Sequence, residues 1–298
     1  MTSFLPRRSS MRRVLPALSL TFLTALPAFA QGALCIVGGG LQPPALVREF
    51  VDLAGGRNRA KIIVFAMASA GGLTSGEAKA ADLRVLGADA RSVWITREQA
   101  GTDSVAHLLD GATGIWFGGG DQARLTGVLR GTVTERAIHR RFAAGAVVGG
   151  TSAGAAVMSA VMITGDERRP GGERRDTTTA FMTIARDNIV TDSGFALLGG
   201  AIVDQHFLRR KRHNRLISLV LERAPHLGVG IDESTALIVS PDGTWRVNGA
   251  SVAVVYDARA AAITPPGAAA LGAAGLRMHV LPAGATFNPA TGEAKLPN

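Results

Sequence analysis

The sequence predicts an α/β fold with a mostly parallel sheet, helices on both faces and C-terminal β-hairpins. The sheet is predicted by short apolar runs that alternate with segments of helical spacing and lead into glycine-rich turns, because strands covered on both faces are apolar throughout. The hairpins are predicted by a change after Ile231, where short apolar segments are separated by turn sequences at 241–243 and 248–249.

The first half of the chain supplies four predicted strands and four predicted helices. The strands are expected at 33–37, 62–66, 115–117 and 146–148, and the helices at 43–53, 75–86, 122–129 and 134–144. Because the carboxyl ends of parallel strands meet at one edge of a sheet, we expect the glycine turns that follow them to form the functional site.

The second half departs from this alternation. Residues 166–182 are charged and polar and predict an exposed loop. Buried strands are expected at 201–203 and 229–231, and hairpin strands at 236–239, 244–247 and 252–256. Residues 258–275 are rich in Ala, Gly and Pro and are expected to cover the sheet edge loosely. No internal boundary is evident, so residues 31–298 are predicted to form one domain.

Residues 1–30 have the pattern of a signal peptide. Paired arginines precede an apolar run from Val14 to Leu26, and an A-x-A cleavage pattern precedes Gln31. We therefore expect an exported protein, periplasmic or secreted, by the general secretory or the twin-arginine route. An uncleaved anchor and a start at Met11 are the alternatives. After cleavage we expect no stable membrane insertion, because no later apolar run is long enough to span a bilayer.

The charge balance tests a nucleic-acid-binding function. With 32 Lys+Arg against 23 Asp+Glu, the formal net charge is +9. Four of these charges lie in the predicted signal peptide, and the remaining arginines are spread along the chain. With a single Tyr, the aromatic residues that stack on single-stranded nucleic acid are also missing. We expect no nucleic-acid partner.

Cysteine, histidine and glycine patterns exclude further classes. Cys35 is the single cysteine, so we expect a buried core thiol and neither a disulfide scaffold nor a cysteine-based zinc site. No HExxH motif or His/Cys cluster is present, so no metal and no cofactor are expected. The glycines at 38–40 follow a strand but lack the third spaced glycine of a dinucleotide fingerprint, which disfavours a nucleotide-binding module.

A G-x-S-x-G pattern at 150–154 lies between a predicted strand and a helix-forming run that begins at Ala155. In a nucleophile elbow, such a turn lifts the serine hydroxyl out of the sheet, and the following helix N-terminus presents N–H groups to an oxyanion. Ser152 is therefore the candidate nucleophile. The alternative is a glycine-rich turn in which Ser152 only caps a helix.

A serine nucleophile needs a base and an acid that orients the base. His206 is the candidate base, because it follows the predicted strand at 201–203 and is expected at the same edge as Ser152. Asp232 and Glu233 follow the predicted strand at 229–231 in the same way. Position alone leaves both acids open.

Four motifs together resemble the cyanophycinases and their relatives in serine peptidase family S51. They are GGGDQ at 118–122, GTSAGA at 150–155, DQHF at 204–207 with the arginines that follow, and GIDESTA at 230–236. The resemblance spans essentially all of residues 31–298. It implies a flavodoxin-like fold of the class I glutamine amidotransferase type and a triad of Ser152, His206 and Glu233. The segment between Ser152 and His206 is lengthened, and 166–182 is the expected place of the additional residues.

The resemblance also implies how the reacting groups are held. The oxyanion is expected to accept hydrogen bonds from the backbone N–H of Ala153 and of Gly119 or Gly120, since glycines let the backbone approach closely. A β-aspartyl unit is expected to be bound by Gln122, Asp204, Gln205, Arg210, Arg212 and Arg215. These arginines belong to a basic run at 209–215, for which a solvated helix face is the alternative explanation.

The resemblance implies an exported serine exopeptidase that releases β-Asp-Arg dipeptides from cyanophycin (multi-L-arginyl-poly-L-aspartate). The partner is then a peptide or polymer substrate, and a homodimer is the assembly that the resemblance suggests. Alternatives are a serine peptidase for other aspartyl or isoaspartyl peptides and a catalytically inactive binding protein. The acid that would bind the substrate guanidinium is left open between Asp121, Asp204 and the acids of 166–182.

Overall fold

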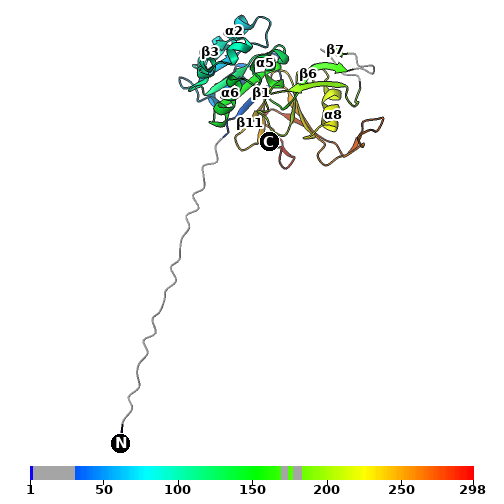
Figure 1. The fold of residues 1–298 in the computed structure, drawn as a ribbon. Helices are drawn as coiled ribbons and strands as arrows, with labels where there is room; N and C mark the ends of the chain where they lie inside the picture. Colours follow the sequence, from blue (N-terminus) through cyan, green and yellow to red (C-terminus); the bar gives the residue numbers. More distant parts are fainter. Residues whose placement is uncertain (3–30, 169–173, 177–182) are drawn as a thin grey trace.

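The computed structural model describes residues 1–2, 31–168, 174–176 and 183–298 (Figure 1). The predicted signal peptide, apart from its first two residues, and much of the predicted loop at 166–182 lie outside the described residues. Within the described ranges, no helix is long and apolar enough to cross a membrane.

The larger sheet contains nine strands of the described chain. Five are parallel, in the order β1 (Leu34–Val37), β5 (Val147–Thr151), β4 (Gly114–Phe117), β2 (Lys61–Phe65) and β3 (Asp89–Val93). On the other side of β1 the sheet continues antiparallel with β11 (Thr235–Val239), β12 (Trp245–Gly249), β17 (Thr286–Asn288) and β18 (Glu293–Lys295). The predicted parallel sheet is thus present, and the predicted hairpin of β11 and β12 continues it in the same sheet, whereas the third predicted hairpin strand, at 252–256, lies in another sheet.

Helices cover both faces of the parallel strands, as predicted. One face is covered by α1 (Pro44–Leu53) and α2 (Gly72–Val85), where Phe50 of α1 packs edge-on against Trp116 of β4. The other face carries α3 (Arg97–Ala100), α4 (Asp103–Ala106), the 3-10 turn η1 (His107–Leu109), α5 (Gln122–Leu129) and α6 (Val133–Ala143). The sequence did not predict β3, because this edge strand is polar and half-exposed.

The strands that carry the candidate base and acid form a second sheet. Its order is β16 (Arg277–Pro282), β13 (Val252–Asp257), β10 (Leu227–Ile231) and β9 (Ile202–Gln205). One face of this sheet joins the main core, and α8 (His213–Glu222) covers the other. The expectation that 201–203 and 229–231 lie in the same sheet as the other buried strands is therefore wrong. Both strands are covered on two faces in either arrangement, so their apolar sequence does not identify the sheet.

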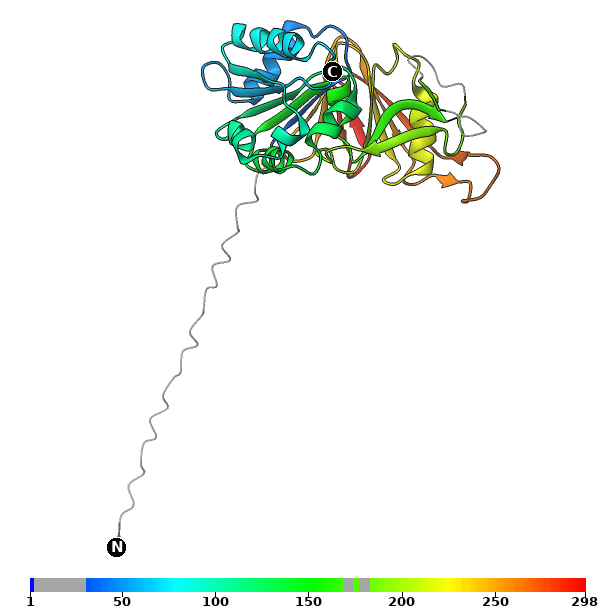
Figure 2. The ribbon, with the colours of Figure 1, turned by 45° about the horizontal axis from the view of Figure 1, so that its top comes forward.

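The prediction of an exposed loop at 166–182 is wrong for its described part. A third sheet, in the order β7-β6-β8, joins β6 (Val161–Arg168), β7 (Arg174–Asp176) and β8 (Ile189–Ser193) beside α8 (Figure 1). Much of β6 is only half-buried, so it lacks the apolar pattern that predicts a strand. The Ala/Gly/Pro-rich segment forms a ribbon of β14 (Ala262–Ile263) and β15 (Ala273–Ala274) that projects from the body (Figure 2).

Cys35 lies on β1 at the centre of the sheet and is fully buried, as predicted. Burial raises the pKa of its thiol well above the ordinary value, because the thiolate would lose its solvation. The thiol is therefore unreactive packing in the core.

Candidate active site

The G-x-S-x-G turn connects β5 to the one-turn helix α7 (Ala153–Ala156). Ser152 at its centre has φ 54° and ψ −109°, a conformation that non-glycine residues rarely adopt. The flanking glycines make this turn possible, since a Cβ on Gly150 would lie 2.5 Å from the carbonyl oxygen of Gly154, and a Cβ on Gly154 would overlap that of Phe117. The turn is therefore an elbow with the serine at its apex.

Ser152, His206 and Glu233 form one hydrogen-bonded chain across the two larger sheets. The Oγ of Ser152 lies 2.9 Å from Nε2 of His206, and Nδ1 of His206 lies 2.6 Å from Oε1 of Glu233. A carboxylate can only accept, so Nδ1 carries the imidazole proton and Nε2 is left to accept from the serine hydroxyl. The arrangement matches the order nucleophile, base and orienting acid.

Asp232 has a different set of partners. Its Oδ1 accepts from the backbone N–H groups of Leu208 and Arg209, each at 3.0 Å, and its Oδ2 accepts from the hydroxyl of Ser251 at 2.8 Å. These bonds hold the turn that follows His206 against β10. Of the two acids left open by position, Glu233 is the one that contacts the imidazole.

The glycines at 38–40 pack directly against the side chains of the base and the acid. The backbone N–H of His206 donates to the carbonyl oxygen of Gly38 at 2.6 Å. A Cβ on Gly39, which has φ +113°, would overlap the imidazole of His206, and a Cβ on Gly40 would lie 2.8 Å from Cβ of Glu233. The sequence predicted that the glycine turns after the strands form the site, but it assigned no specific role to the glycines at 38–40. Their position at the end of a strand indicated a close backbone approach without identifying the partner.

The predicted oxyanion residues lie beside the serine. Ala153 is the residue after Ser152, and a Cβ on Gly119 would lie 3.5 Å from Cβ of Ser152. Gly120 has φ +135°, and a side chain there would overlap the carbonyl oxygen of Ala68. The 118–120 turn thus approaches Ser152 closely because it lacks side chains.

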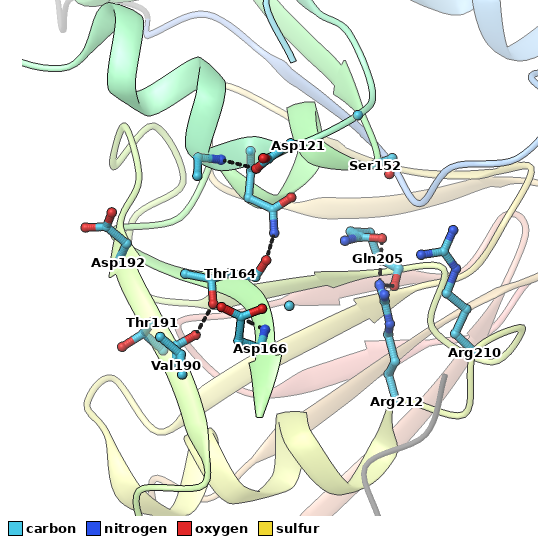
Figure 3. A pocket seen from close by; sticks show the side chains of 14 residues that line it. Asp121, Ser152, Thr164, Asp166, Val190, Thr191, Asp192, Gln205, Arg210 and Arg212 are labelled. Atoms are coloured by element: carbon cyan, nitrogen blue, oxygen red, sulfur yellow. Dashed lines mark hydrogen bonds between the residues drawn. The ribbon is translucent and has the colours of Figure 1, made fainter. Parts of the chain in front are cut away.

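Ser152 opens into a cavity of about 580 Å³, within the range of small-molecule sites. Arg210, Arg212 and Gln205 line it on one side (Figure 3). Three acids, Asp121, Asp166 and Asp192, line it across from the arginines. The cavity therefore has a cationic side and an anionic side.

Four of the six predicted substrate-binding residues line this cavity. Gln122 donates from Nε2 to the carbonyl oxygens of Ile163 at 2.8 Å and Thr164 at 2.5 Å, which ties α5 to β6. Arg212 donates from Nη1 to the backbone oxygen of Gln205 at 2.7 Å and to its Oε1 at 2.8 Å. These contacts keep polar groups at the cavity wall, and Arg210 lines the same wall.

The prediction that Asp204 and Arg215 bind substrate needs correction. Both side chains are 0% exposed, do not line the cavity and pair with each other; Nε of Arg215 donates to Oδ2 of Asp204 at 2.7 Å, and Nη2 contacts Oδ1. Successive residues of a strand face opposite sides. On β9, Asp204 therefore faces α8, as Ile202 does, while Gln205 faces the cavity.

The surroundings of His206 favour its neutral form. Burial lowers the pKa of His206, because the imidazolium would lose solvation. The positive charges of Arg210 and Arg212 lower this pKa further, whereas the hydrogen bond to Glu233 raises it.

Within the described ranges, no group of three or more His, Cys, Asp or Glu residues is placed to hold a metal ion.

The chain is similar to a known protein family and to several of its members. Residues 44–246 match the family described as peptidase family S51. The chain is 36% identical over 197 residues to a cyanophycinase of Trichormus variabilis, covering 64% of this chain and 62% of that protein. It is 34% identical over 220 residues to a cyanophycinase of Geminocystis herdmanii, covering 72% of this chain and 74% of that one. The match thus spans less than two thirds of the length of the Trichormus protein.

Two solved structures share the fold. One is a peptidase from an acI-B1 Actinobacterium, with a TM-score of 0.60 and 20% identity, covering 86% of this chain and 96% of that one. The other is a putative peptidase E from Listeria monocytogenes EGD-e, with a TM-score of 0.51 and 14% identity, covering 74% and 99%. These likenesses concern the fold alone.

Proposed function

Since this chain belongs to peptidase family S51, we propose that it is a serine peptidase of the cyanophycinase type, which hydrolyses cyanophycin to β-Asp-Arg dipeptides. The observation that carries the proposal is the hydrogen-bonded chain of Ser152, His206 and Glu233 at a cavity with one cationic and one anionic side. The cyanophycinase relatives support the substrate class.

The chemistry follows from the positions of these groups. Neutral His206 takes the proton of Ser152 through Nε2 as the serine oxygen attacks the scissile carbonyl. The backbone N–H groups of Ala153 and of Gly119 or Gly120 stabilise the oxyanion that forms. The imidazolium, held by Glu233, then gives its proton to the leaving amine. Water activated by His206 hydrolyses the acyl-enzyme and restores the serine.

The charges of the cavity match those of one cyanophycin unit, which carries a free carboxylate and a guanidinium. Arg210 suits the carboxylate, because its planar fork can form two parallel hydrogen bonds. Asp204 is paired with Arg215, which leaves the three cavity acids to bind the guanidinium. The site can therefore be locally acidic for a substrate arginine although the whole chain is basic.

The test is product identification. Residues 31–298 are incubated with cyanophycin and, separately, with isoaspartyl dipeptides, and the products are identified by mass spectrometry. We expect β-Asp-Arg dipeptides from cyanophycin. Cleavage of isoaspartyl dipeptides alone would replace the proposed substrate by other aspartyl peptides, and binding without cleavage of either would support the inactive binding protein.

Export by residues 1–30 is part of the same proposal and rests on the sequence pattern of that segment. Fractionation of the producing cells, followed by N-terminal sequencing, should find a protein that begins at Gln31 outside the cytoplasm. A protein that keeps residues 1–30 and stays in the cytoplasm would contradict export.

Arg210→Gln is expected to move the acid limb of the kcat/KM profile to higher pH. The positive charge of Arg210 lowers the pKa of His206, so its removal raises that pKa, and the neutral base is then lost at a higher pH. The measurement is kcat/KM against pH for both proteins. Arg209→Gln is the control, because Arg209 is exposed and is not among the groups that shift His206. Equal limbs for Arg210→Gln and the wild type would contradict the influence of Arg210 on the pKa of His206.

Gly39→Ala is expected to lower kcat by about 100-fold, since a displacement of about 1 Å in a catalytic group has an effect of that order. The added Cβ would overlap the imidazole of His206 and push it away from Ser152. Gly243→Ala is the matched control, because Gly243 also has positive φ but no atom lies within 4 Å of the place that a Cβ would take there. If both variants keep wild-type kcat, the 38–40 turn does not position the base.

A further inference from the structure

A second, smaller cavity adjoins the catalytic one at the same two turns. Gly118, Gly119 and Thr151 line the smaller cavity, whereas the next residues, Gly120 and Ser152, line the catalytic cavity. Its volume is about 180 Å³, below the range of sites for whole small molecules. It therefore has room for one functional group rather than for a whole small molecule.

The cavity contains a lysine whose close contacts are with neutral groups. Nζ of Lys79 on α2 donates to Oε1 of Gln42 at 2.6 Å and lies 5.0 Å from the ring centroid of Trp116. In the described part of the chain, no carboxylate lies within 4.0 Å of this ammonium; Asp82, one turn further along α2, acts on it only at longer range. Burial lowers the pKa of Lys79, because its charge is partly removed from water.

Two more residues that line this cavity carry polar groups with unused hydrogen-bonding capacity. The indole N–H of Trp116 and the hydroxyl of Thr151 are buried, and neither has a hydrogen-bond partner among the described residues. Both residues line the cavity. Buried polar groups are normally paired, so two unpaired ones beside a lysine in one cavity require an explanation. A bound group with two acceptor oxygens and a negative charge would satisfy all three.

We propose that this cavity is a carboxylate subsite, which binds a carboxylate of the unit on the leaving side of the scissile bond. The proposal rests on the proposed peptidase function. Lys79 supplies the charge, and Trp116 and Thr151 supply neutral donors, while the acyl unit occupies the larger cavity on the other side of Ser152. Among the described residues, only the 118–120 turn and the elbow at Thr151 and Ser152 lie at the boundary of the two cavities, and the turn carries no side chains.

The experiment compares two substrates and several variants. The substrates are a two-unit cyanophycin fragment with free carboxylates and the same fragment with the carboxylates of its leaving unit converted to carboxamides. Wild-type protein is expected to prefer the free acid by about tenfold in kcat/KM, mainly through KM, as one charged hydrogen bond would give. Lys79→Met and Lys79→Gln should lose this preference, and Lys79→Arg should keep part of it.

Lys61→Met is the matched control, because Lys61 is exposed at the opposite end of a parallel strand. Circular dichroism and thermal unfolding establish that each variant is folded. A wild-type preference that both Lys79→Met and Lys79→Gln retain would overturn the subsite. A change in kcat/KM on adding sodium acetate that depends on Lys79, without any preference between the two substrates, would also overturn it, since the cavity would then bind a small free anion.

A binding measurement tests this proposal independently of the peptidase function. The β-Asp-Arg dipeptide and its carboxamide are titrated calorimetrically into wild-type protein and Lys79→Met. If wild-type protein cleaves neither substrate but binds the acid more tightly than the amide, and only when Lys79 is present, the peptidase function fails and the subsite stands. If Lys79→Met binds both dipeptides as the wild type does, the subsite fails.

Discussion

Ser152→Ala is expected to lower kcat for amide hydrolysis by about 10⁴- to 10⁶-fold, the range seen when one member of a serine triad is removed. The variant lacks the hydroxyl that lies 2.9 Å from Nε2 of His206, so no acyl-enzyme can form. The fold should be unchanged, because alanine tolerates the turn as well as serine does and the flanking glycines remain.

Turnover of cyanophycin measures this effect, and two further variants define its origin. His206→Ala should be about as inactive as Ser152→Ala, and the double variant should be hardly worse than either, because groups that act as a unit lose their effect together. Ser104→Ala, at an exposed serine of α4, should keep full activity. Substantial hydrolysis by Ser152→Ala would disprove the role of nucleophile, and additive losses would mean that the two residues act separately.

Arg215→Met is expected to lower the free energy of unfolding by about 3–5 kcal/mol, the usual effect of breaking a buried ion pair. The substitution leaves the carboxylate of Asp204 buried with its main partner removed. Arg212, whose Nη1 lies 3.9 Å from Oδ1 of Asp204, remains as a weaker partner and should keep the loss near the lower value. Urea unfolding at neutral pH measures the change.

The double variant Asp204→Asn/Arg215→Met should recover part of this loss, since no unpaired charge is then buried. Lys295→Met, which removes an exposed pair with Glu293, should leave the unfolding midpoint unchanged. If Arg215→Met unfolds at the wild-type urea concentration but loses substrate affinity, Arg215 acts on substrate directly and the structural role assigned from its burial is wrong.

Local sequence was sufficient for most of the secondary structure and for the elbow. All eight strands and helices expected in the first half of the chain form within three residues of their predicted bounds. Apolar runs and helical spacing determine these elements because both patterns act over a few neighbouring residues. The polar strands β3 and β6 were missed, since each is largely half-exposed and lacks such a pattern.

The choice between neighbouring residues could not be made from sequence position. Asp232 and Glu233 both follow β10, yet one bonds the turn after His206 and the other bonds its imidazole. Asp204 and Gln205 are adjacent on β9, yet Asp204 is buried beneath α8 and Gln205 lines the cavity. Strand alternation predicts that such neighbours face opposite sides, but not which side holds the site.

The sequence by itself determined the strand–turn–helix units, the serine elbow and the set of residues from which a catalytic site could be formed. Only the tertiary structure placed β9 and β10 in a second sheet, packed Gly39 against His206 and formed the cavity that Lys79 lines beside the catalytic one. The physical reason is the distance along the chain over which each kind of interaction acts. Backbone turns and apolar periodicity depend on a few adjacent residues, whereas these contacts join segments far apart in the chain and depend on how whole elements pack.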